Sequence, residues 1–399
     1  MVLIVSMMQK YVKNLRLPNV YAKNLFFFLT FAAKKMKLHI FNPEHDLALA
    51  SGLSNFTAPH AARRLRADLG YLPALWADEG DCVLVENAAK SRLAFGRLRA
   101  RIPRPVPVIS RFVEASELAA LSIDEVEPWG WDLALRAYLV RHCVEAVPSE
   151  QQIAAIRDLS HRRHATTLLE HLVTDPSLVS SEANYKGTVP TCPISATSFS
   201  DVEDSLRRLG RIVVKAPWSS SGRGVRFIAD GISATDAGWI RNVIARQGTV
   251  MVEPYYNKVK DFGMEFESDG HGGISYLGLS LFETRGGAYT GNIVASEDDK
   301  RALLARYVEP ARLDAIAAAV SSGLANIVGV RYRGPLGVDM MIVARGDVSE
   351  GFLLHPCVEI NLRRTMGHVA LAVPSLPDGR PRSMRIELTD KYRLRLRRL

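Results

Sequence analysis

Apolar residues recur along this chain with two different periods, and the order in which the periods alternate predicts a mixed α/β protein. Residues 37–42 and 82–86 are short apolar runs typical of buried strands, and residues 59–75 carry apolar positions at helical spacing. A strand, a loop and a helix in that order predict a small α/β domain with a parallel sheet. Its ligand crevice should lie beyond the carboxyl ends of the strands, where the polar turn 42–46 follows the first strand. This turn either contacts a small molecule or caps the next helix.

Hairpins are frequent in the second half of the chain. Two β-branched runs, residues 212–214 and 225–228, flank a tip of serines and glycines, which predicts a β-hairpin with few side chains at its turn. The periodicity elsewhere predicts helices at 129–146, 149–159, 166–173, 200–209, 233–247 and 309–328. It predicts further strands at 249–253, 262–267, 274–282, 336–344 and 352–361, with a loop over 185–194. We expect the last two of these to be the final core strands and to form one hairpin.

The tip of the central hairpin has the residue types of a phosphate-binding loop. Gly222 and Gly224 permit positive φ, so that successive backbone N–H groups can turn toward one anion. Ser219, Ser220 and Ser221 add hydroxyl donors, and Lys215 at the end of the first strand adds a positive charge. The alternative is an ordinary hairpin turn rich in serine and glycine.

The last predicted hairpin carries acidic residues in an otherwise apolar setting. Alternate residues of a strand share a face, so Glu359 and Asn361 should point the same way. If the turn is centred near Ser349, Asp339 lies directly opposite Glu359. Two carboxylates and an amide oxygen at close range are ligands that suit Mg²⁺ together with phosphate oxygens and water. The alternative is that these side chains face solvent.

A phosphate loop, a lysine and a Mg²⁺ site together indicate nucleoside triphosphate chemistry. The chain contains neither a Gly-x-x-x-x-Gly-Lys-Ser/Thr loop nor the catalytic signatures of protein kinases. The motifs that are present, in their order and approximate spacing, resemble the ATP-grasp superfamily over about residues 150–370. They are Val213-Val214-Lys215-Ala216-Pro217, Ser220-Ser221-Gly222-Arg223-Gly224-Val225, Val252-Glu253-Pro254, Gly337-Val338-Asp339 and Val358-Glu359-Ile360-Asn361-Leu362-Arg363.

The resemblance implies an α/β (α+β) ATP-grasp fold with a preceding Rossmann-like α/β domain. The domains would be an N-terminal extension outside the fold (1–36), the preceding α/β domain (37–148), an N-lobe with the glycine-rich loop (149–253) and a C-lobe with the Mg²⁺ hairpin (254–399). It also implies a role for each matching residue. Lys215 would contact the α- and β-phosphates of ATP, and Glu253 would lie at the hinge that binds adenine. Ser219, Ser220, Ser221, Gly222, Arg223 and Gly224 would cover the phosphates.

The same resemblance implies that Asp339, Glu359 and Asn361 hold one or two Mg²⁺ (or Mn²⁺) ions. Arg285 and Arg364 would bind the γ-phosphate or a substrate carboxylate, because the guanidinium fork suits both; each could instead form a surface ion pair. The family usually has a further phosphate-binding lysine near residue 163, where this chain has Arg162 and Arg163. We expect Arg163, or Arg162, to replace it.

The activity implied is that of an ATP-dependent ligase. A small-molecule carboxylate would be activated as an acyl phosphate and captured by an amine, or by a thiol. Two rival functions are a small-molecule kinase on the same scaffold and a nucleotide-binding protein without turnover.

Charge and composition narrow the classes of partner. The chain has 399 residues, 51 basic and 42 acidic, with a net charge of +9. The excess arginines are scattered without interleaved aromatic residues, so we expect anionic small molecules, not nucleic acid, as ligands. The four cysteines are far apart, which favours a reducing, cytoplasmic location.

The N-terminal region allows two interpretations. Basic residues followed by the apolar run 25–33 resemble a short signal peptide, and the run is too brief to span a membrane. We favour an over-extended start, with the fold beginning near Met36. Oligomeric state is left open, with a homo-oligomer among the states allowed.

Overall fold

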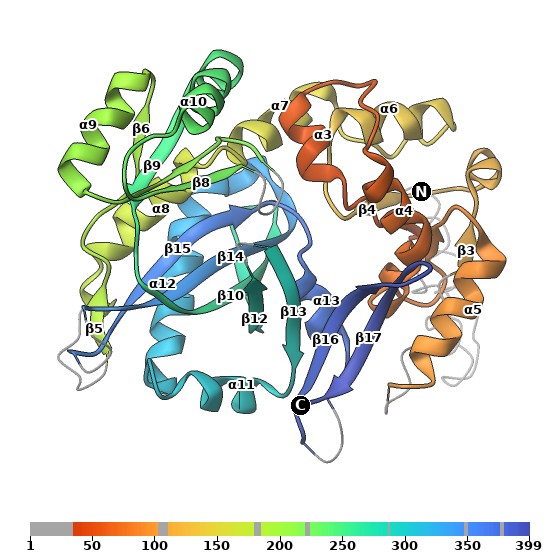
Figure 1. Ribbon diagram of the computed structural model, residues 1–399. Helices are drawn as coiled ribbons and strands as arrows, with labels where there is room; N and C mark the ends of the chain where they lie inside the picture. The colour runs from red at the N-terminus through yellow and green to blue at the C-terminus, as the bar shows by residue number, and fades with distance from the viewer. Residues whose placement is uncertain are drawn as a thin grey trace, which may run out of the picture. The chain divides into compact units, whose positions relative to one another are not determined.

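The computed structural model describes residues 35–102, 111–178, 185–219, 224–285, 288–346, 350–375 and 379–399. The chain divides into two units, Met1–Met36 and Lys37–Leu399. The described elements of Lys37–Leu399 form sheets of four or five strands with helices packed on them (Figure 1). Short 3₁₀ helices lie at η1 (Leu72–Leu75), η2 (Ala115–Ala120), η3 (Pro176–Leu178) and η4 (Gly329–Arg331).

The first sheet is parallel, as the alternation of strand and helix predicts. Its strand order is β3-β2-β1-β4, so β1 lies inside the sheet with β2 and β4 beside it. The strands are β1 (Lys37–Ile40), β2 (Cys82–Leu84), β3 (Arg111–Val113) and β4 (Glu125–Pro128). The helices of this region are α3 (His45–Ser51), α4 (His60–Leu69), α5 (Ala88–Arg99) and α6 (Leu133–Arg141).

The predicted central hairpin belongs to a second, antiparallel sheet of order β6-β9-β7-β8. Its strands are β6 (Ile194–Ala196), β7 (Ile212–Lys215), β8 (Val225–Ile228) and β9 (Val250–Pro254), and its helices are α9 (Phe199–Leu209) and α10 (Ala234–Gln247). Apolar residues of both helices and of the strands form one small core. This unit therefore has a core of its own and carries Lys215 at the end of β7.

The third sheet has the order β11-β10-β14-β15-β5 and carries the predicted acidic hairpin. Its strands are β5 (Tyr185–Thr188), β10 (Lys258–Asp269), β11 (Ile274–Ser280), β14 (Arg333–Ala344) and β15 (Phe352–Asn361). The neighbouring helices are α7 (Glu150–Leu159), α8 (Arg163–Val173), α11 (Glu297–Leu304) and α12 (Pro310–Val328).

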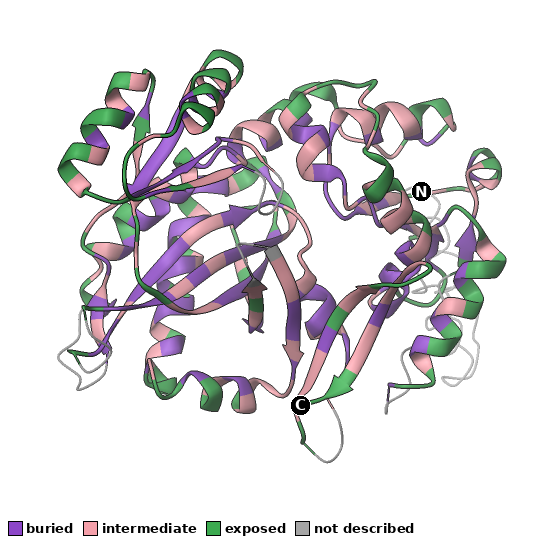
Figure 2. Ribbon diagram, viewed as in Figure 1, coloured by how far each residue is buried: buried purple, intermediate pink, exposed green. Residues whose placement is uncertain are grey.

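Helices α8 and α12 cover one face of this third sheet. Helix α8 packs against β15, and α12 packs against α8 and β11. Alternate residues of β14, namely Leu336, Val338, Met340 and Ile342, are buried in the core beneath these helices (Figure 2). The residues between them, including Asp339, therefore point to the opposite face. Among the described helices, α12 has the length and hydropathy of a membrane span, but its apolar side lies in this core.

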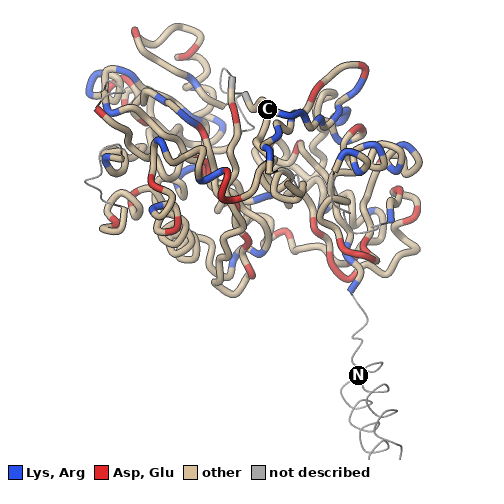
Figure 3. The backbone as a smooth tube through the Cα atoms, turned by 90° about the horizontal axis from the view of Figure 1, so that it is seen from below, with Lys and Arg blue, Asp and Glu red and all other residues tan. Residues whose placement is uncertain are grey.

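A fourth sheet, β12-β13-β16-β17, forms from segments in which the hydrophobic periodicity is weak. Its elements are β12 (Phe282–Arg285), β13 (Ala288–Val294), β16 (Arg382–Leu388), β17 (Tyr392–Arg398) and the nearby helix α13 (Met366–Ala372). The expectation that β14 and β15 are the final core strands is wrong, because Met384 and Leu394 of the last hairpin are buried in the core that includes the first sheet. Lys and Arg residues recur along this C-terminal hairpin, where the backbone tube is largely blue (Figure 3).

Two further expectations about local structure are wrong. The segment predicted as a loop at 185–194 contains β5 and the start of β6, because β5 pairs with β15 and β6 pairs with β9. The helix expected from residue 200 begins at Phe199, because its capping residue is Ser198, whose hydroxyl accepts a hydrogen bond from Asp201 N.

Candidate active site

The acidic residues of the β14–β15 hairpin lie in the predicted register. Asp339 is directly opposite Glu359, and Asn361 is opposite Gly337. The amide Nδ2 of Asn361 donates a hydrogen bond to Asp339 Oδ2 at 3.2 Å. All three side chains lie on the sheet face that α8 and α12 leave uncovered, so their oxygens can act on one ligand.

Asp339 is held in an environment that disfavours its charge. Burial raises the pKa of Asp339 to about 7, and the nearby carboxylates of Glu359 and Glu265 add to this shift. The hydrogen bond from Asn361 and the charge of Arg363 oppose it. A carboxylate in this state has a strong preference for a nearby cation.

Arg162 connects the acidic hairpin with the central hairpin. Its Nη2 lies 2.8 Å from Glu359 Oε1, while its Nε donates to the carbonyl of Ala216 at 2.9 Å and its Nη2 to Ser219 Oγ at 3.2 Å. The side chain is buried, with 8% of its surface exposed. Arg162 therefore occupies the place between the phosphate-loop hairpin and Glu359, whereas Arg163 pairs with Asp158 on the surface.

Lys215 and Glu253 face each other on neighbouring strands of the second sheet. Glu253 of β9 is opposite Val213, so it lies diagonally across from Lys215 on the same face. The Lys215 ammonium forms a buried ion pair with Glu253 Oε1. Burial, together with the charges of Asp339, Glu359 and Glu253, raises the pKa of the Cys357 thiol of β15, and the charge of Lys215 opposes this shift. Lys215 and the acidic residues therefore all lie near that thiol.

These contacts place the lysine of one hairpin and the acidic residues of another on two sides of a single site. This arrangement is the one expected from the resemblance of the motifs to the ATP-grasp superfamily. No protein-family model matches the chain.

Several solved structures resemble the chain weakly. One is N5-carboxyaminoimidazole synthetase from Staphylococcus aureus complexed with ADP, at 17% identity over 90% of this chain and 84% of that chain, with a TM-score of 0.45. A second is the biotin carboxylase domain of Hydrogenobacter thermophilus 2-oxoglutarate carboxylase, at 12% identity over 88% of this chain and 74% of that chain, with a TM-score of 0.49. A third is biotin carboxylase from Campylobacter jejuni, at 14% identity over 88% and 75%, with a TM-score of 0.43. Because these TM-scores are below 0.5, the likenesses do not assign the chain to a family.

The glycine-rich loop between β7 and β8 is described only at its ends. Ser220, Ser221, Gly222 and Arg223 lie outside the described residues. At the near end, a Cβ on Gly224 would lie 2.1 Å from Ser219 Cβ, and Gly224 O accepts a hydrogen bond from Ala216 N at 2.8 Å. Only glycine allows the two arms of the hairpin to approach so closely.

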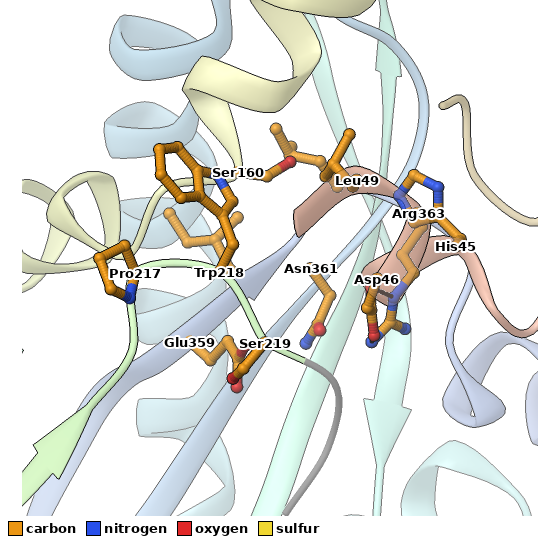
Figure 4. A pocket seen from close by; sticks show the side chains of 12 residues that line it. His45, Asp46, Leu49, Ser160, Pro217, Trp218, Ser219, Glu359, Asn361 and Arg363 are labelled. Atoms are coloured by element: carbon orange, nitrogen blue, oxygen red, sulfur yellow. Dashed lines mark hydrogen bonds and ion pairs between the residues drawn. The ribbon is translucent and has the colours of Figure 1, made fainter. Parts of the chain in front are cut away.

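A pocket lies between the acidic hairpin and the turn that follows β1 (Figure 4). Its lining includes His45 and Asp46 of that turn, Trp218 and Ser219 of the central hairpin, and residues 359–363. The predicted turn 42–46 thus reaches the same site as Glu359 and Asn361. The alternative that this turn caps the next helix by a side chain has no support, since Glu44 at the N-cap makes no side-chain capping hydrogen bond.

Arg363 lies at the edge of this pocket and was quoted in the sequence only as part of a motif. Its Nε and Nη2 bind Asp46 Oδ1 and Oδ2 at 2.6 and 2.8 Å. Burial alone would raise the pKa of Asp46, but the Arg363 guanidinium holds it below its ordinary value. Arg363 lies just after β15, so strand alternation could not have placed it; the only sequence signal was its position two residues after Asn361.

The two arginines predicted to be catalytic are placed differently. Arg364 points toward the first sheet, where its Nη2 lies 3.2 Å from Glu127 Oε2 and its guanidinium lies over the Trp76 ring at 4.8 Å. Arg285 is the last residue of β12, and its side chain lies outside what the structure describes. Arg364 is not among the residues that line the pocket beside Glu359, and the catalytic roles of both arginines stay predictions.

The chemistry of the donor set fits Mg²⁺ only in the presence of further ligands. Among the residues that the structure describes, no group of three or more His, Cys, Asp or Glu side chains could hold a metal ion. Asp339, Glu359 and Asn361 supply two carboxylates and one amide oxygen. Because Mg²⁺ is commonly bound by one or two carboxylates plus substrate phosphates and water, this set suits a metal that arrives with a nucleotide.

Proposed function

We propose that this protein is an ATP-dependent ligase that activates a small-molecule carboxylate as an acyl phosphate, which an amine then captures. The observation that carries this proposal is the convergence of Lys215, Arg162 and the Asp339–Glu359–Asn361 set on one site between two hairpins. Cations and metal ligands gathered around one point suit the transfer of a phosphoryl group, which requires positioning and charge stabilisation more than a dedicated base.

Asp339, Glu359 and Asn361 would hold Mg²⁺, which when bound neutralises phosphate charge and aligns the phosphates. Lys215 would exchange its pairing with Glu253 for the α- and β-phosphates, since it ends β7 directly before the phosphate loop. Arg162 would stabilise charge on the transferred phosphoryl group in the role of the family's early lysine, because its guanidinium already bridges Ser219 and Glu359.

The carboxylate substrate would occupy the pocket between Glu359 and the turn after β1. Arg363 is the cation at that position, and its planar fork, now bound to Asp46 through two nitrogens, matches a carboxylate. The amine would approach from the same pocket, which His45 and Ser160 also line.

Hydroxylamine trapping tests this proposal without knowledge of the amine. The protein is incubated with ATP, Mg²⁺ and pools of carboxylates. The carboxylate oxygen attacks the γ-phosphorus, ADP leaves, and hydroxylamine then displaces inorganic phosphate from the acyl carbon to give a hydroxamate. We expect hydroxamate, ADP and phosphate in equal amounts from at least one pool.

Two variants on the same hairpin sharpen the measurement. Glu359→Gln should reduce hydroxamate formation at least about 100-fold, since the side chain that would bind the metal, and that also pairs with Arg162, loses its charge. Glu350→Gln, an exposed position at the other end of the hairpin, should retain the wild-type rate. Turnover that is unaffected by Glu359→Gln, or phosphate that stays on an organic product, would contradict the ligase assignment.

A further inference from the structure

His355 of β15 is a buried polar side chain that the proposed chemistry does not use. None of its surface is exposed to solvent. Neither Nδ1 nor Nε2 has a hydrogen-bond partner among the described residues. Buried side-chain nitrogens are nearly always hydrogen-bonded, because leaving one unpaired is costly. Two unpaired nitrogens on one ring therefore call for a partner beyond the residues that the structure describes.

The position of His355 in the sheet points its ring toward the nucleotide side. His355 is directly opposite Met341 of β14, and Met341 is two residues from Asp339 on the same strand. Paired residues share a face, and so do alternate residues of one strand. His355 therefore projects from the same face as Asp339 and Glu359, not toward the core beneath α8 and α12.

The neighbours of His355 belong to the second sheet and to the connection that leaves it. Burial lowers the pKa of His355 to about 3, and the nearby charge of Lys215 contributes to the shift, so the imidazole is neutral. The ring of Tyr256, two residues after β9, packs edge-on against it at 5.6 Å. A neutral imidazole offers one N–H donor and one acceptor nitrogen.

We propose that His355 hydrogen-bonds the nucleoside part of the bound nucleotide and helps to set nucleotide specificity. The inference rests on the proposed function. Two residues of a strand span about 7 Å. A nucleotide whose terminal phosphates lie at Asp339 and Glu359, and which passes Lys215, reaches the level of Met341 and His355 with its ribose and base. There, the paired donor and acceptor of the ring match the hydrogen-bonding groups of a base edge or of the ribose hydroxyls.

Calorimetric titration of His355→Leu with two ligands tests this inference. ADP and tripolyphosphate, both with Mg²⁺, share the phosphate contacts, but only ADP has a nucleoside. We expect the Kd for ADP to rise about tenfold, the effect of losing one hydrogen bond, and the Kd for tripolyphosphate to stay unchanged. The ligand-free variant should melt at the same temperature as the wild type or higher, because two unpaired buried nitrogens are removed.

Two further variants guard against a trivial effect on folding. His355→Asn keeps one donor and one acceptor and should recover part of the affinity for ADP. Leu354→Val changes a buried neighbour that points to the opposite face, so it should lower the melting temperature while both affinities stay at wild-type values. Comparison of ADP, 2′-deoxy-ADP and GDP in the wild type and in His355→Leu identifies the group contacted. If 2′-deoxy-ADP or GDP binds more weakly than ADP to the wild type but equally well to His355→Leu, the group that this ligand lacks is the one that His355 contacts.

Three results would overturn the inference. An unchanged Kd for ADP in His355→Leu, with a lowered melting temperature, would make the ring a structural group. An equal loss of affinity for ADP and tripolyphosphate would show that the whole site is disturbed. A wild-type protein that binds neither ligand would instead remove the proposed function and this inference with it.

Discussion

The carboxyl groups of Asp339 and Glu359 differ in the partner that each of them faces. The two carboxylates are directly opposed, and Glu359 is compensated by Arg162 at 2.8 Å. Among the described residues, the amide of Asn361 is the hydrogen-bonding partner of the Asp339 carboxyl. Its carboxyl therefore keeps a proton to a higher pH than an ordinary aspartate does, mainly because it is buried.

This protonation predicts a pH dependence of stability in the ligand-free protein. Folded Asp339, with a pKa of about 7, binds a proton that the unfolded chain has released above about pH 4. The free energy of unfolding should therefore fall as the pH rises from about 4 to 7. Asp339→Asn removes this loss, and at pH 8 we expect its melting temperature to exceed that of the wild type by about 2–4 °C.

Calorimetry at pH 5.5 and pH 8 checks this prediction. Asp175→Asn is the matched control: the Ser177 hydroxyl and backbone N–H hold the pKa of this exposed carboxyl below its ordinary value, so it does not titrate in this range. A wild type and an Asp339→Asn variant with the same pH profile would contradict the raised pKa.

The pairing of Asp339 with Glu359 could be predicted, but the choice of Arg162 could not. Pairing in a hairpin follows from the position of the turn and the alternation of the strands, both of which are local. Arg162 and Arg163 are adjacent, and which of them points inward depends on where α8 begins and on the carbonyl of Ala216, more than 50 residues later. That information is in the tertiary structure, not in the spacing.

At the scale of elements, the turn from β15 into α13 holds a buried carboxylate next to the acidic hairpin. Thr365 caps α13, and its hydroxyl accepts from Gly367 N at 3.0 Å and donates to Glu265 Oε1 at 2.8 Å. Glu265 is 3% exposed, and a Cβ on Gly367 would lie 1.8 Å from Glu265 Oε1. The cap of one helix is thus also the hydrogen-bond donor for a buried carboxylate beside the acidic hairpin.

Removal of this cap should cost more than removal of an ordinary one. Thr365→Ala loses the cap and the hydrogen bond to Glu265 Oε1, while His368 Nδ1 stays 2.9 Å from the other carboxylate oxygen; we expect the free energy of unfolding to fall by about 2–4 kcal/mol. Ser198→Ala removes the exposed cap of α9 and should cost about 1 kcal/mol. Urea unfolding measures both, with Thr365→Ser expected to stay close to the wild type. Equal costs for the two alanine variants would show that the bond to Glu265 contributes nothing.

Several elements could not be predicted because their patterns are weak or misleading. The segment 392–398 reads as a basic tail, yet its arginines alternate with Leu394 and Leu396, which face the core as β17. The strands β5 and β6 are three or four residues long and flanked by prolines, so only pairing with β15 and β9 makes them strands. Short edge strands have little local signal.

At the scale of the whole unit Lys37–Leu399, the end of the chain completes a core begun near its start. Met384 and Leu394 are buried with Phe41, Leu69 and residues around them. The backbone N–H of Tyr392 donates to Asp68 Oδ2 at 2.8 Å, which ties β17 to α4. The first sheet therefore depends on residues more than 300 positions later.

A core substitution and a truncation test this dependence. Leu394→Ala should lower the free energy of unfolding by about 2–5 kcal/mol, and it should shift loss of the first sheet and of the C-terminal hairpin together. A chain that begins at Met36 should keep the wild-type melting temperature, since we expect residues 1–36 to lie outside the fold. Hydrogen exchange at β1 and β17 measures the first effect and calorimetry the second. Exchange that rises only at β17 would mean that the two regions unfold separately.

Under the proposed function, the half-buried ion pair Arg162–Glu359 and the buried pair Lys215–Glu253 affect how ATP and Mg²⁺ would enter the site. A polyphosphate that binds without a metal ion would pair with Lys215 and Arg162. Glu253 and Glu359 would then have no counter-ion in a site that solvates charge poorly. A divalent ion that binds without a polyphosphate would pair with Glu359 and leave the Arg162 guanidinium without a counter-ion. When the chelate of both arrives in one encounter, each group trades one counter-ion for another and none is left over. The site would therefore bind the Mg²⁺–ATP chelate in preference to ATP alone or Mg²⁺ alone.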